Sequence, residues 1–241
     1  MRVAVVSDLH ANLVALDAVL ADAGDVDAVW HLGDVVGYGP DPDGVVARLA
    51  EIGATGVAGN HDRAATGALD IYWFNEDARA AIVWTRHRIA PVTTEWLAAL
   101  PGTRTEAGIF LVHGSPRDPT WEYILTAAIA RAGFEQLPTP LGLYGHTHLP
   151  MAWTLQASRI GNVFPDDAPF LAVAGPDRVL ANPGSVGQPR DGDPRAGWLE
   201  LDTDAGEIRW HRVAYDVAAV QAEMRAAGLP IRLIERLRVG L

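Results

Sequence analysis

Five short apolar runs, each followed by polar residues, organise the chain up to Pro150. A continuous apolar run of roughly four to eight residues is typical of a strand buried on both faces. Apolar positions at helical spacing separate the first three runs, and residues 63–100 also have a helical pattern. This alternation predicts βαβ units in a parallel sheet. The five runs occupy residues 3–6, 28–32, 55–58, 109–112 and 141–144.

The pattern changes after Pro150, where short strand-like pieces alternate with turn residues. We expect these pieces to add antiparallel strands, which would form a second sheet packed on the first. Residues 215–241 predict a C-terminal helical segment, broken at residues 228–230 by glycine and proline. The chain has no internal repeat and no linker, so we predict one domain over residues 1–241, with residues 117–140 as a candidate cap over the strand ends. The strand-like pieces lie at residues 151–155, 170–173, 179–181, 198–201 and 208–210.

Charge and composition narrow the classes of function. The 241 residues carry a formal net charge of −11, which argues against a broad nucleic-acid-binding surface because such surfaces are basic. An anionic substrate stays compatible with this charge, because bound metal cations can reverse the local field. The chain has no cysteine, so disulfides and thiolate metal sites are excluded. We see no signal peptide and no apolar stretch of about 18–20 residues, and we therefore expect a soluble cytoplasmic protein that does not span a membrane.

Potential metal ligands follow each of the five apolar runs. In open α/β sheets, ligand sites gather at the carboxyl ends of the strands, so we expect these side chains to meet. Imidazole and carboxylate groups favour zinc, iron or manganese over calcium or magnesium. The ligands are too many for one ion and could fill two sites about 3.5–4 Å apart, where a metal pair generates hydroxide at neutral pH. The residues are Asp8, His10, Asp34, Asn60, His113, His146 and His148, and His61 lies directly after Asn60.

The polar residues that follow the five apolar runs resemble the motifs of the calcineurin-like metallophosphoesterase family. The matching motifs are Asp-x-His at 8–10, Gly-Asp at 33–34, Gly-Asn-His-Asp at 59–62, a single histidine at 113, and Gly-His-x-His at 145–148. The resemblance implies an α/β fold, a four-layer αββα sandwich of two packed mixed β-sheets with flanking helices. Residues 37–40 and 182–187 are similar to the small prokaryotic phosphodiesterase branch of the family.

The resemblance also implies a role for each matching residue. One metal ion would be held by Asp8, His10, Asp34 and His148, and the other by Asp34, Asn60, His113 and His146. Asp34 would bridge two divalent or mixed-valence ions of manganese, iron or zinc. A hydroxide bound to this dinuclear centre would attack a phosphodiester or a small phosphomonoester. His61 would act as the general acid, or would stabilise the charge on the leaving-group oxygen.

The chain departs from the family pattern at Gly37, where many relatives have an aspartate that orients the catalytic histidine. The partner of His61 is therefore open, and Asp62 is one candidate. The Arg-Gly pair that follows in protein phosphatases is also missing, so a phosphodiesterase is favoured over a protein phosphatase. Arg63 and Arg190 are candidate phosphate contacts for a phosphorylated small molecule or a nucleotide.

Two other functions stay open at this point. The chain could be a non-catalytic metal-binding scaffold for protein partners, or a nucleic-acid-cleaving enzyme that uses the same metals. His31 lies within an apolar run and His87 within a helical pattern, so we expect both to be structural, and His211 is a weak ligand candidate. The physiological substrate, the native metals and the oligomeric state do not follow from the sequence.

Overall fold

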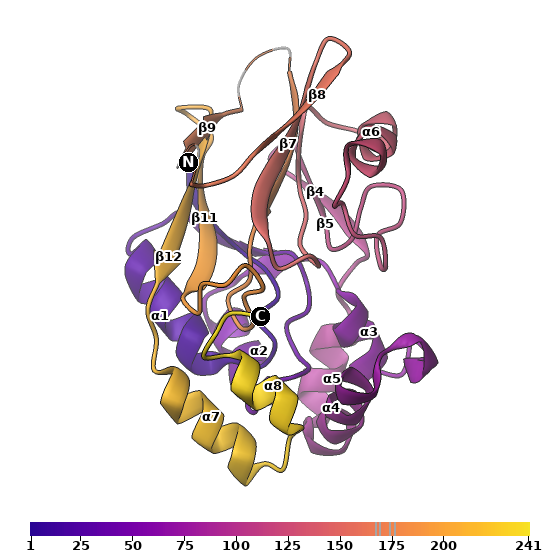
Figure 1. Cartoon of the computed structure of the whole chain (residues 1–241), viewed down its shortest axis with the longest axis vertical. Coiled ribbons are helices and arrows are strands. Elements are labelled where there is room, and N and C mark those ends of the chain that lie inside the picture. The colour runs from indigo at the N-terminus through magenta and orange to yellow at the C-terminus, as the bar shows by residue number, and fades with distance from the viewer. Residues whose placement is uncertain (167, 169, 174, 176) are drawn as a thin grey trace.

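Two six-stranded sheets form the centre of the molecule in the computed structural model, which describes residues 1–166, 168, 170–173, 175 and 177–241 (Figure 1). The strand order of the first sheet is β3-β2-β1-β11-β12-β9, and that of the second is β4-β5-β6-β10-β7-β8. The first sheet contains β1 (Arg2–Val6), β2 (Ala28–His31), β3 (Thr55–Gly56), β9 (Phe170–Ala172), β11 (Ala196–Asp202) and β12 (Glu207–Val213). The second contains β4 (Thr103–Glu106), β5 (Ile109–Val112), β6 (Leu141–Leu143), β7 (Pro150–Gln156), β8 (Arg159–Val163) and β10 (Arg178–Pro183).

Both sheets are mixed. In the first sheet β1, β2 and β3 run parallel, and β11 pairs with β1 in the antiparallel direction. In the second sheet β5, β6 and β10 run parallel, and β7 is antiparallel to β10. The strands after Pro150 therefore join both sheets, which corrects the expectation that they form a separate second sheet. A strand that returns from far along the chain can extend either open edge, and periodicity does not distinguish the two.

Successive side chains of the central strands point to opposite faces of their sheet and pack against different layers of the molecule. In β1, Val3 and Val5 face the second sheet, whereas Ala4 and Val6 join the cluster beneath the helices of the opposite face. β5 alternates in the same way, since Leu111 lies between the sheets and Phe110 packs under a helix on the other side. Because successive side chains of a strand point to opposite faces, each central strand is buried on both sides. The fold is the expected four-layer αββα sandwich.

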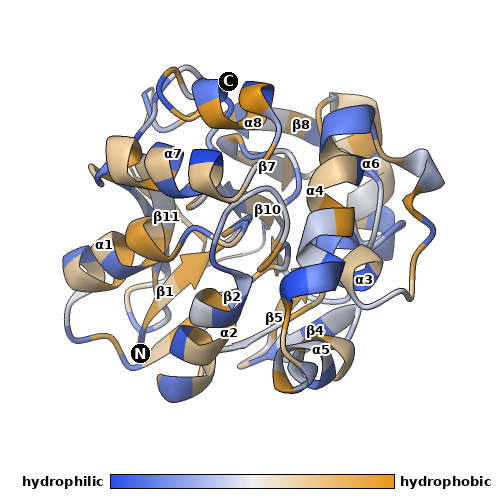
Figure 2. Ribbon diagram, turned by 90° about the horizontal axis from the view of Figure 1, so that it is seen from below, coloured by the Kyte–Doolittle hydropathy of each residue, from blue (hydrophilic) through white to orange (hydrophobic). Residues whose placement is uncertain are grey.

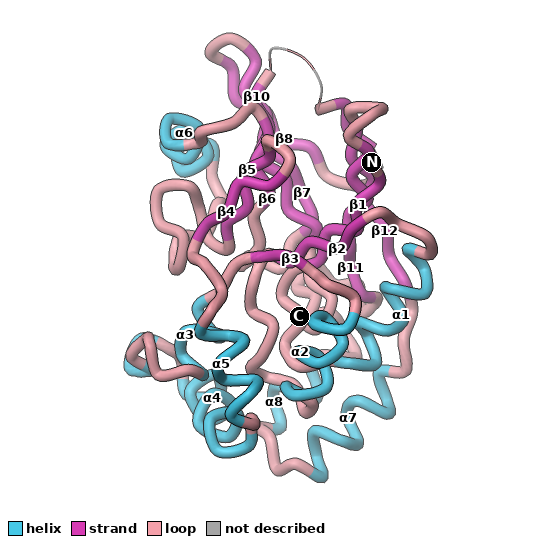
Figure 3. The backbone as a smooth tube through the Cα atoms, turned by 180° about the vertical axis from the view of Figure 1, so that it is seen from behind, coloured by secondary structure: helices cyan, strands magenta, loops and turns pink. Residues whose placement is uncertain are grey.

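The helices cover the outer faces and one end of the sheets. Phe134 of α6 belongs to the cluster on the outer face of the second sheet, and α1 lies against β11 of the first. Figures 1 and 3 show α3, α4, α5, α7 and α8 gathered at one end of the sheets, and Figure 2 shows apolar β1 surrounded by helices with mixed faces. The helices are α1 (Leu13–Ala23), α2 (Pro42–Glu51), α3 (Asn60–Ala65), α4 (Glu76–Arg88), α5 (Pro91–Ala98), α6 (Ala127–Gln136), α7 (Val217–Ala226) and α8 (Ile231–Arg236).

Several boundaries differ from the sequence-based expectations. β3 is shorter than the apolar run at 55–58, since the strand ends at Gly56 and residues 57–59 connect it to α3. The helical stretch 63–100 is interrupted between α3 and α4, where only the short 3-10 helix η1 (Ile71–Trp73) forms. In the segment 117–140, α6 lies on the outer face of the second sheet, whereas Trp121 and Tyr123 from the preceding loop line the cavity beside the ligand loops. Among the described residues, no helix is both long and apolar enough to cross a membrane.

Candidate metal centre

The structure brings the predicted ligands into two adjoining clusters that share Asp34. The first cluster is Asp8, His10, Asp34 and His148, and the second contains Asp34, His113 and His146. Within each cluster the potential ligand atoms lie within 4.8 Å of one another, and all of these residues are buried. The amide of Asn60 lies 3.1 Å from Nε2 of His113, so this residue adjoins the second cluster.

Asp34 occupies the position that a bridging carboxylate needs. Its Oδ2 atom lies 3.7 Å from Nε2 of His10 and 3.4 Å from Nε2 of His113. Its Oδ1 atom accepts a hydrogen bond of 2.9 Å from the backbone N–H of His61, which fixes the carboxylate plane. One side chain therefore faces the imidazoles of both clusters.

Each of the four clustered histidines has one ring nitrogen at a backbone carbonyl oxygen. Nδ1 of His113 is 2.8 Å from the oxygen of Leu32, and Nδ1 of His148 is 2.5 Å from that of Gln188. Similar contacts join Nδ1 of His10 to Val36 at 3.3 Å and Nε2 of His146 to Trp121 at 3.2 Å. A carbonyl oxygen only accepts, so each of these nitrogens carries a proton, and in the neutral ring the other nitrogen carries a lone pair.

Those lone pairs face one another. Nε2 of His10 lies 3.2 Å from Nε2 of His148, and Nε2 of His113 lies 3.1 Å from Nδ1 of His146. Two facing acceptors repel unless a cation lies between them. Donation of the second ring N–H to a carbonyl is the arrangement that usually orients histidine ligands of metals. The donor set therefore fits a pair of transition-metal ions.

The backbone at these residues is strained. Asp8, His10, Asp34, His146 and His148 have φ angles of 52°, 46°, 51°, 66° and 58°. This left-handed region is uncommon for residues other than glycine, and such conformations cost on the order of 1–3 kcal/mol each. They persist because hydrogen bonds such as Asp8 N to Gly33 O and His10 N to Asp34 O fix the loops. Strain concentrated at one cluster is typical of a functional site.

Burial and charge shift the pKa values of the clustered groups in different directions. Burial lowers the pKa of His10 well below its usual value and that of His146 to about 3, so both rings are neutral. Burial alone would raise the pKa of Asp34, but His113 and His61 outweigh it and hold that pKa well below the usual range. Asp34 in turn outweighs the burial of His113 and raises its pKa to about 9, so His113 has to release a proton when a metal ion binds. Metal ions bind neutral imidazole and ionised carboxylate.

The ring of His61 lies next to the clusters and is held by other rings. Its centroid is 4.4 Å from that of Tyr38, 4.9 Å from His10 and 5.0 Å from Phe74. A Cβ atom at Gly37 would lie only 2.5 Å from Nδ1 of His61, and this buried nitrogen has no hydrogen-bond partner among the described residues. Burial lowers the pKa of His61 to about 4.

Asp62 does not orient His61 in this structure. Its Oδ1 accepts a hydrogen bond from the backbone N–H of Val36 at 3.0 Å, and its Oδ2 accepts one from Gly59 at 2.9 Å. The carboxylate therefore joins the loop after β2 to the start of α3. Through these two bonds the Asp62 side chain fixes the backbone next to His61.

The two candidate phosphate contacts differ in position. Arg190 lines a cavity of about 210 Å³ together with Asp34, Asn60 and His148, and its guanidinium carbon lies 6.0 Å from the Tyr38 ring centroid. Arg63 is not one of the described residues that line this cavity, and its Nη2 lies close to Gly102. The structure therefore brings Arg190 to the clusters and leaves Arg63 aside, because α3 directs the two neighbours His61 and Arg63 to different sides.

The loop after β10, which contains part of the segment 182–187 that resembles the small prokaryotic phosphodiesterase branch, supports the centre. Ser185 Oγ donates to the backbone oxygen of Asp8 at 2.8 Å, and the oxygen of Gln188 faces His148. Asn182 donates to the oxygen of Gly145 at 2.7 Å. The Asn-Pro-Gly-Ser sequence at 182–185 signals a turn, but only the fold places this turn beneath the ligand loops.

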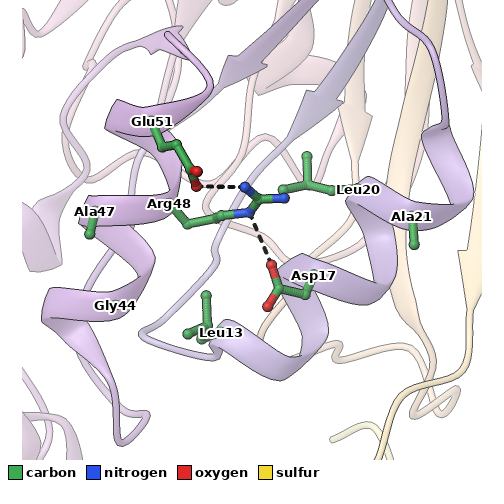
Figure 4. Close-up of a pocket in the computed structure, with 8 residues that line it drawn as sticks. All are labelled: Leu13, Asp17, Leu20, Ala21, Gly44, Ala47, Arg48 and Glu51. Carbon is green, nitrogen blue, oxygen red and sulfur yellow. Dashed lines mark hydrogen bonds and ion pairs between the residues drawn. The ribbon is translucent and has the colours of Figure 1, made fainter.

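The remaining histidines lie in other surroundings. His31 is buried against Trp96, with ring centroids 5.6 Å apart, and His87 is exposed on α4. His211 stacks on Trp198 at 4.2 Å in the first sheet. A larger hollow between α1 and α2 contains none of the predicted ligands, and there Arg48 forms ion pairs with Asp17 and Glu51 (Figure 4).

Comparisons with known proteins agree with the geometry. A family model described as a calcineurin-like phosphoesterase superfamily domain matches residues 1–205. The crystal structure of a metallophosphoesterase from Sphaerobacter thermophilus has 44% sequence identity and a TM-score of 0.90, with 100% of this chain and 99% of that chain covered. An uncharacterized protein of Methanocaldococcus jannaschii is 32% identical over 248 residues, which span 99% of this chain and 98% of that protein. A hypothetical protein from Pyrococcus horikoshii OT3 shares the fold, with 21% identity, a TM-score of 0.78, and coverage of 100% and 98%.

Proposed function

Because the chain belongs to the calcineurin-like phosphoesterase superfamily, we propose that it is a metal-dependent hydrolase of phosphodiesters or small phosphomonoesters. The observation that carries this proposal is the inward orientation of four imidazoles, each with its other ring nitrogen at a backbone carbonyl oxygen. A metal-binding scaffold would need the same ligands, but it would have no need of His61, whose ring lies 4.9 Å from that of His10.

We assign Asp8, His10, Asp34 and His148 to one metal ion, and Asp34, Asn60, His113 and His146 to the other. The mixture of imidazole and carboxylate groups favours manganese, iron or zinc. Such a metal pair supplies hydroxide at neutral pH and neutralises charge on the phosphoryl oxygens. Asp34 would keep the two ions at a fixed separation, because its Oδ2 atom faces both clusters.

His61 is the residue we assign to the leaving group. It lines the same cavity as Asp34 and Asn60, so its ring borders the space in which a phosphoryl group would lie. With its pKa lowered to about 4, the ring is neutral at neutral pH. The ring would therefore act chiefly through an N–H hydrogen bond to the leaving-group oxygen, which stabilises the charge developing there, and less as a charged general acid.

Arg190 is the proposed phosphate contact. One Nη atom donates to Gln188 Oε1 at 3.1 Å, and this bond directs the guanidinium across Tyr38. Its buried Nε has no partner among the described residues. A planar guanidinium with free donors binds phosphate oxygens well.

Hydrolysis of bis-p-nitrophenyl phosphate tests the proposal. The purified protein is loaded separately with manganese, zinc or magnesium, its metal content is measured, and the rate is compared with that of Asp34→Asn. We expect hydrolysis by the loaded protein and almost none by the variant. If protein that holds two metal ions gives only the background rate with this diester and with a panel of monoesters, the scaffold function replaces the enzymatic one.

A further inference from the structure

Aromatic side chains form much of the wall of the cavity beside the metal clusters. The polar part of the wall includes Asp34, Asn60, His61 and Arg190, and aromatic rings make up most of the rest. The rings belong to Tyr38, Trp73, Phe74, Trp121 and Tyr123. Aromatic pockets with a few converging polar groups are typical of sites for small organic ligands.

The rings come from separate segments of the chain. Trp73 and Phe74 lie at the end of η1, between α3 and α4, whereas Trp121 and Tyr123 lie in the loop between β5 and α6. The two segments meet where Phe74 packs on Trp121, with centroids 5.0 Å apart. Tyr123 lies flat on the ring of His146, at 4.0 Å and 9°. The segments therefore form one aromatic wall next to a predicted ligand.

Trp73 is the unusual member of this wall. Its side chain is 73% exposed although it lines the cavity, whereas Phe74 is 7% exposed and packs in the hydrophobic core. An exposed indole at the mouth of a cavity gains nothing from burial within its own chain, and it is free to stack on a ligand. Its neighbour Tyr72 is also 73% exposed but is not one of the described residues that line the cavity.

The cavity has a volume of about 210 Å³. Pockets that enclose drug-sized ligands are larger, roughly 300–1,000 Å³. The space beside the metal clusters thus suits a phosphoryl group with one ring system rather than a long or branched ligand.

We propose that the substrate is a phosphoester whose organic part is a flat aromatic ring system, a nucleobase or an aryl group, which stacks on Trp73 at the mouth of the cavity. This inference rests on the proposed phosphoesterase function and names the substrate class of the same site. The stack fixes the organic group, while Arg190 and the metal ligands hold the phosphoryl group.

Calorimetric titration of the metal-loaded protein with three phosphomonoesters tests the inference, and each protein compared here also carries His61→Ala so that the esters are not hydrolysed during the titration. Adenosine 5′-monophosphate carries a nucleobase, phenyl phosphate carries an aryl ring, and ribose 5-phosphate carries neither. We expect the otherwise wild-type protein to bind at least one ring-bearing ester more tightly than ribose 5-phosphate. Stacking of a base on an aromatic side chain predicts a weakening of about 5- to 150-fold for that ester in Trp73→Ala, with ribose 5-phosphate unchanged.

Matched variants separate stacking from a general disturbance. Phe170→Ala removes an exposed ring that is not among the described residues lining the cavity, and this variant should bind all three ligands as the otherwise wild-type protein does. Trp73→Phe should restore most of the affinity. The inference is overturned if the otherwise wild-type protein does not distinguish the ring-bearing esters, or if Trp73→Ala weakens ribose 5-phosphate by the same factor. Turnover of bis-p-nitrophenyl phosphate by the wild-type protein is measured in parallel, so that loss of the proposed function itself is recognised separately.

Discussion

The orientation of His61 depends on contacts between rings and on the absence of a side chain at Gly37. The imidazole touches Tyr38, His10 and Phe74, and its Nδ1 faces the Cα side of Gly37. Where relatives use a carboxylate to hold the histidine, this chain uses steric confinement. Residue 37 must therefore be a glycine, because any side chain there would collide with the imidazole.

Gly37→Ala should reduce kcat by at least about tenfold while metal content stays unchanged, because a Cβ there would displace the ring. Steady-state kinetics and metal analysis measure the two effects. Gly53→Ala is the matched control, since Gly53 also has a positive φ, 64°, but has open space around the new Cβ. Both variants should lose about 1–2 kcal/mol of stability from the left-handed backbone, and only the first should lose turnover.

His61→Ala should retain both metal ions and lose about 10²- to 10⁴-fold in kcat, because the leaving-group oxygen loses its hydrogen-bond donor. The exposed His87 on α4 provides the control, and His87→Ala should behave as the wild type does. Full activity of His61→Ala with measured metal occupancy would remove this residue from the mechanism.

The sequence predicted which residues converge but not how they are held. Asp8 and His10 were recognisable because they directly follow an apolar strand. The carbonyl partners of the histidines, such as Leu32 and Gln188, carry no side-chain signal, because their backbone oxygens are used. The left-handed φ angles were likewise invisible, since they arise from tertiary constraints on residues that are not glycine.

At the scale of elements, the start of a helix could be recognised from its capping residues, whereas strands at the edge of a sheet could not be recognised from the sequence. Asp41 accepts from Gly44 N at the start of α2, where Pro42 follows it at the first helical position, a common signal for the start of a helix. β4 escaped prediction because its residues, Thr103–Glu106, are largely exposed and polar at the edge of a sheet. β8 is also an edge strand with little burial. Neither strand has the apolar face on which the period-two signal depends.

The turn after β10 and the ligand loop after β6 form one unit through Asn182. This side chain donates to Gly145 O at 2.7 Å and to Thr147 Oγ1 at 3.1 Å, and it accepts from Gly184 N at 2.8 Å. All three bonds are buried. The loop that carries His146 and His148 thus depends on a residue from a neighbouring strand.

Asn182→Ala should weaken metal binding by about 10- to 100-fold, because the loop loses its support. Loss of buried hydrogen bonds should also lower the free energy of unfolding by roughly 1–3 kcal/mol. Titration with a fluorescent competitor for zinc measures the first effect and chemical denaturation the second. The exposed Asn162 of β8 gives the control variant Asn162→Ala, for which neither quantity should change.

At the scale of the whole molecule, the proposed ions would join loops of both sheets. Asp34 follows a strand of the first sheet, whereas His113 follows a strand of the second, and their side chains are 3.4 Å apart. Bound ions would therefore stabilise the contact between the layers as well as the individual loops.

Metal removal should lower the thermal midpoint. At a free metal concentration of 100 times Kd, one bound ion adds about 2.7 kcal/mol to the free energy of unfolding. Thermal unfolding with and without a chelator measures the shift. The shift should largely disappear in Asp34→Asn and persist in Asp204→Asn, which changes an exposed carboxylate. An equal shift in both variants would mean that the ions act elsewhere.

The pairing of β1 sets the order in which the protein can mature on the ribosome. This first strand lies between β2 and β11, and Arg2 is opposite Asp202. A nascent chain that ends at residue 150 already includes all seven proposed ligands, yet one edge of β1 is unpaired and the Ser185 contact to Asp8 is missing. We therefore expect the released fragment 1–150 to bind zinc poorly, and nascent chains to become competent only after residue 202 has left the exit tunnel.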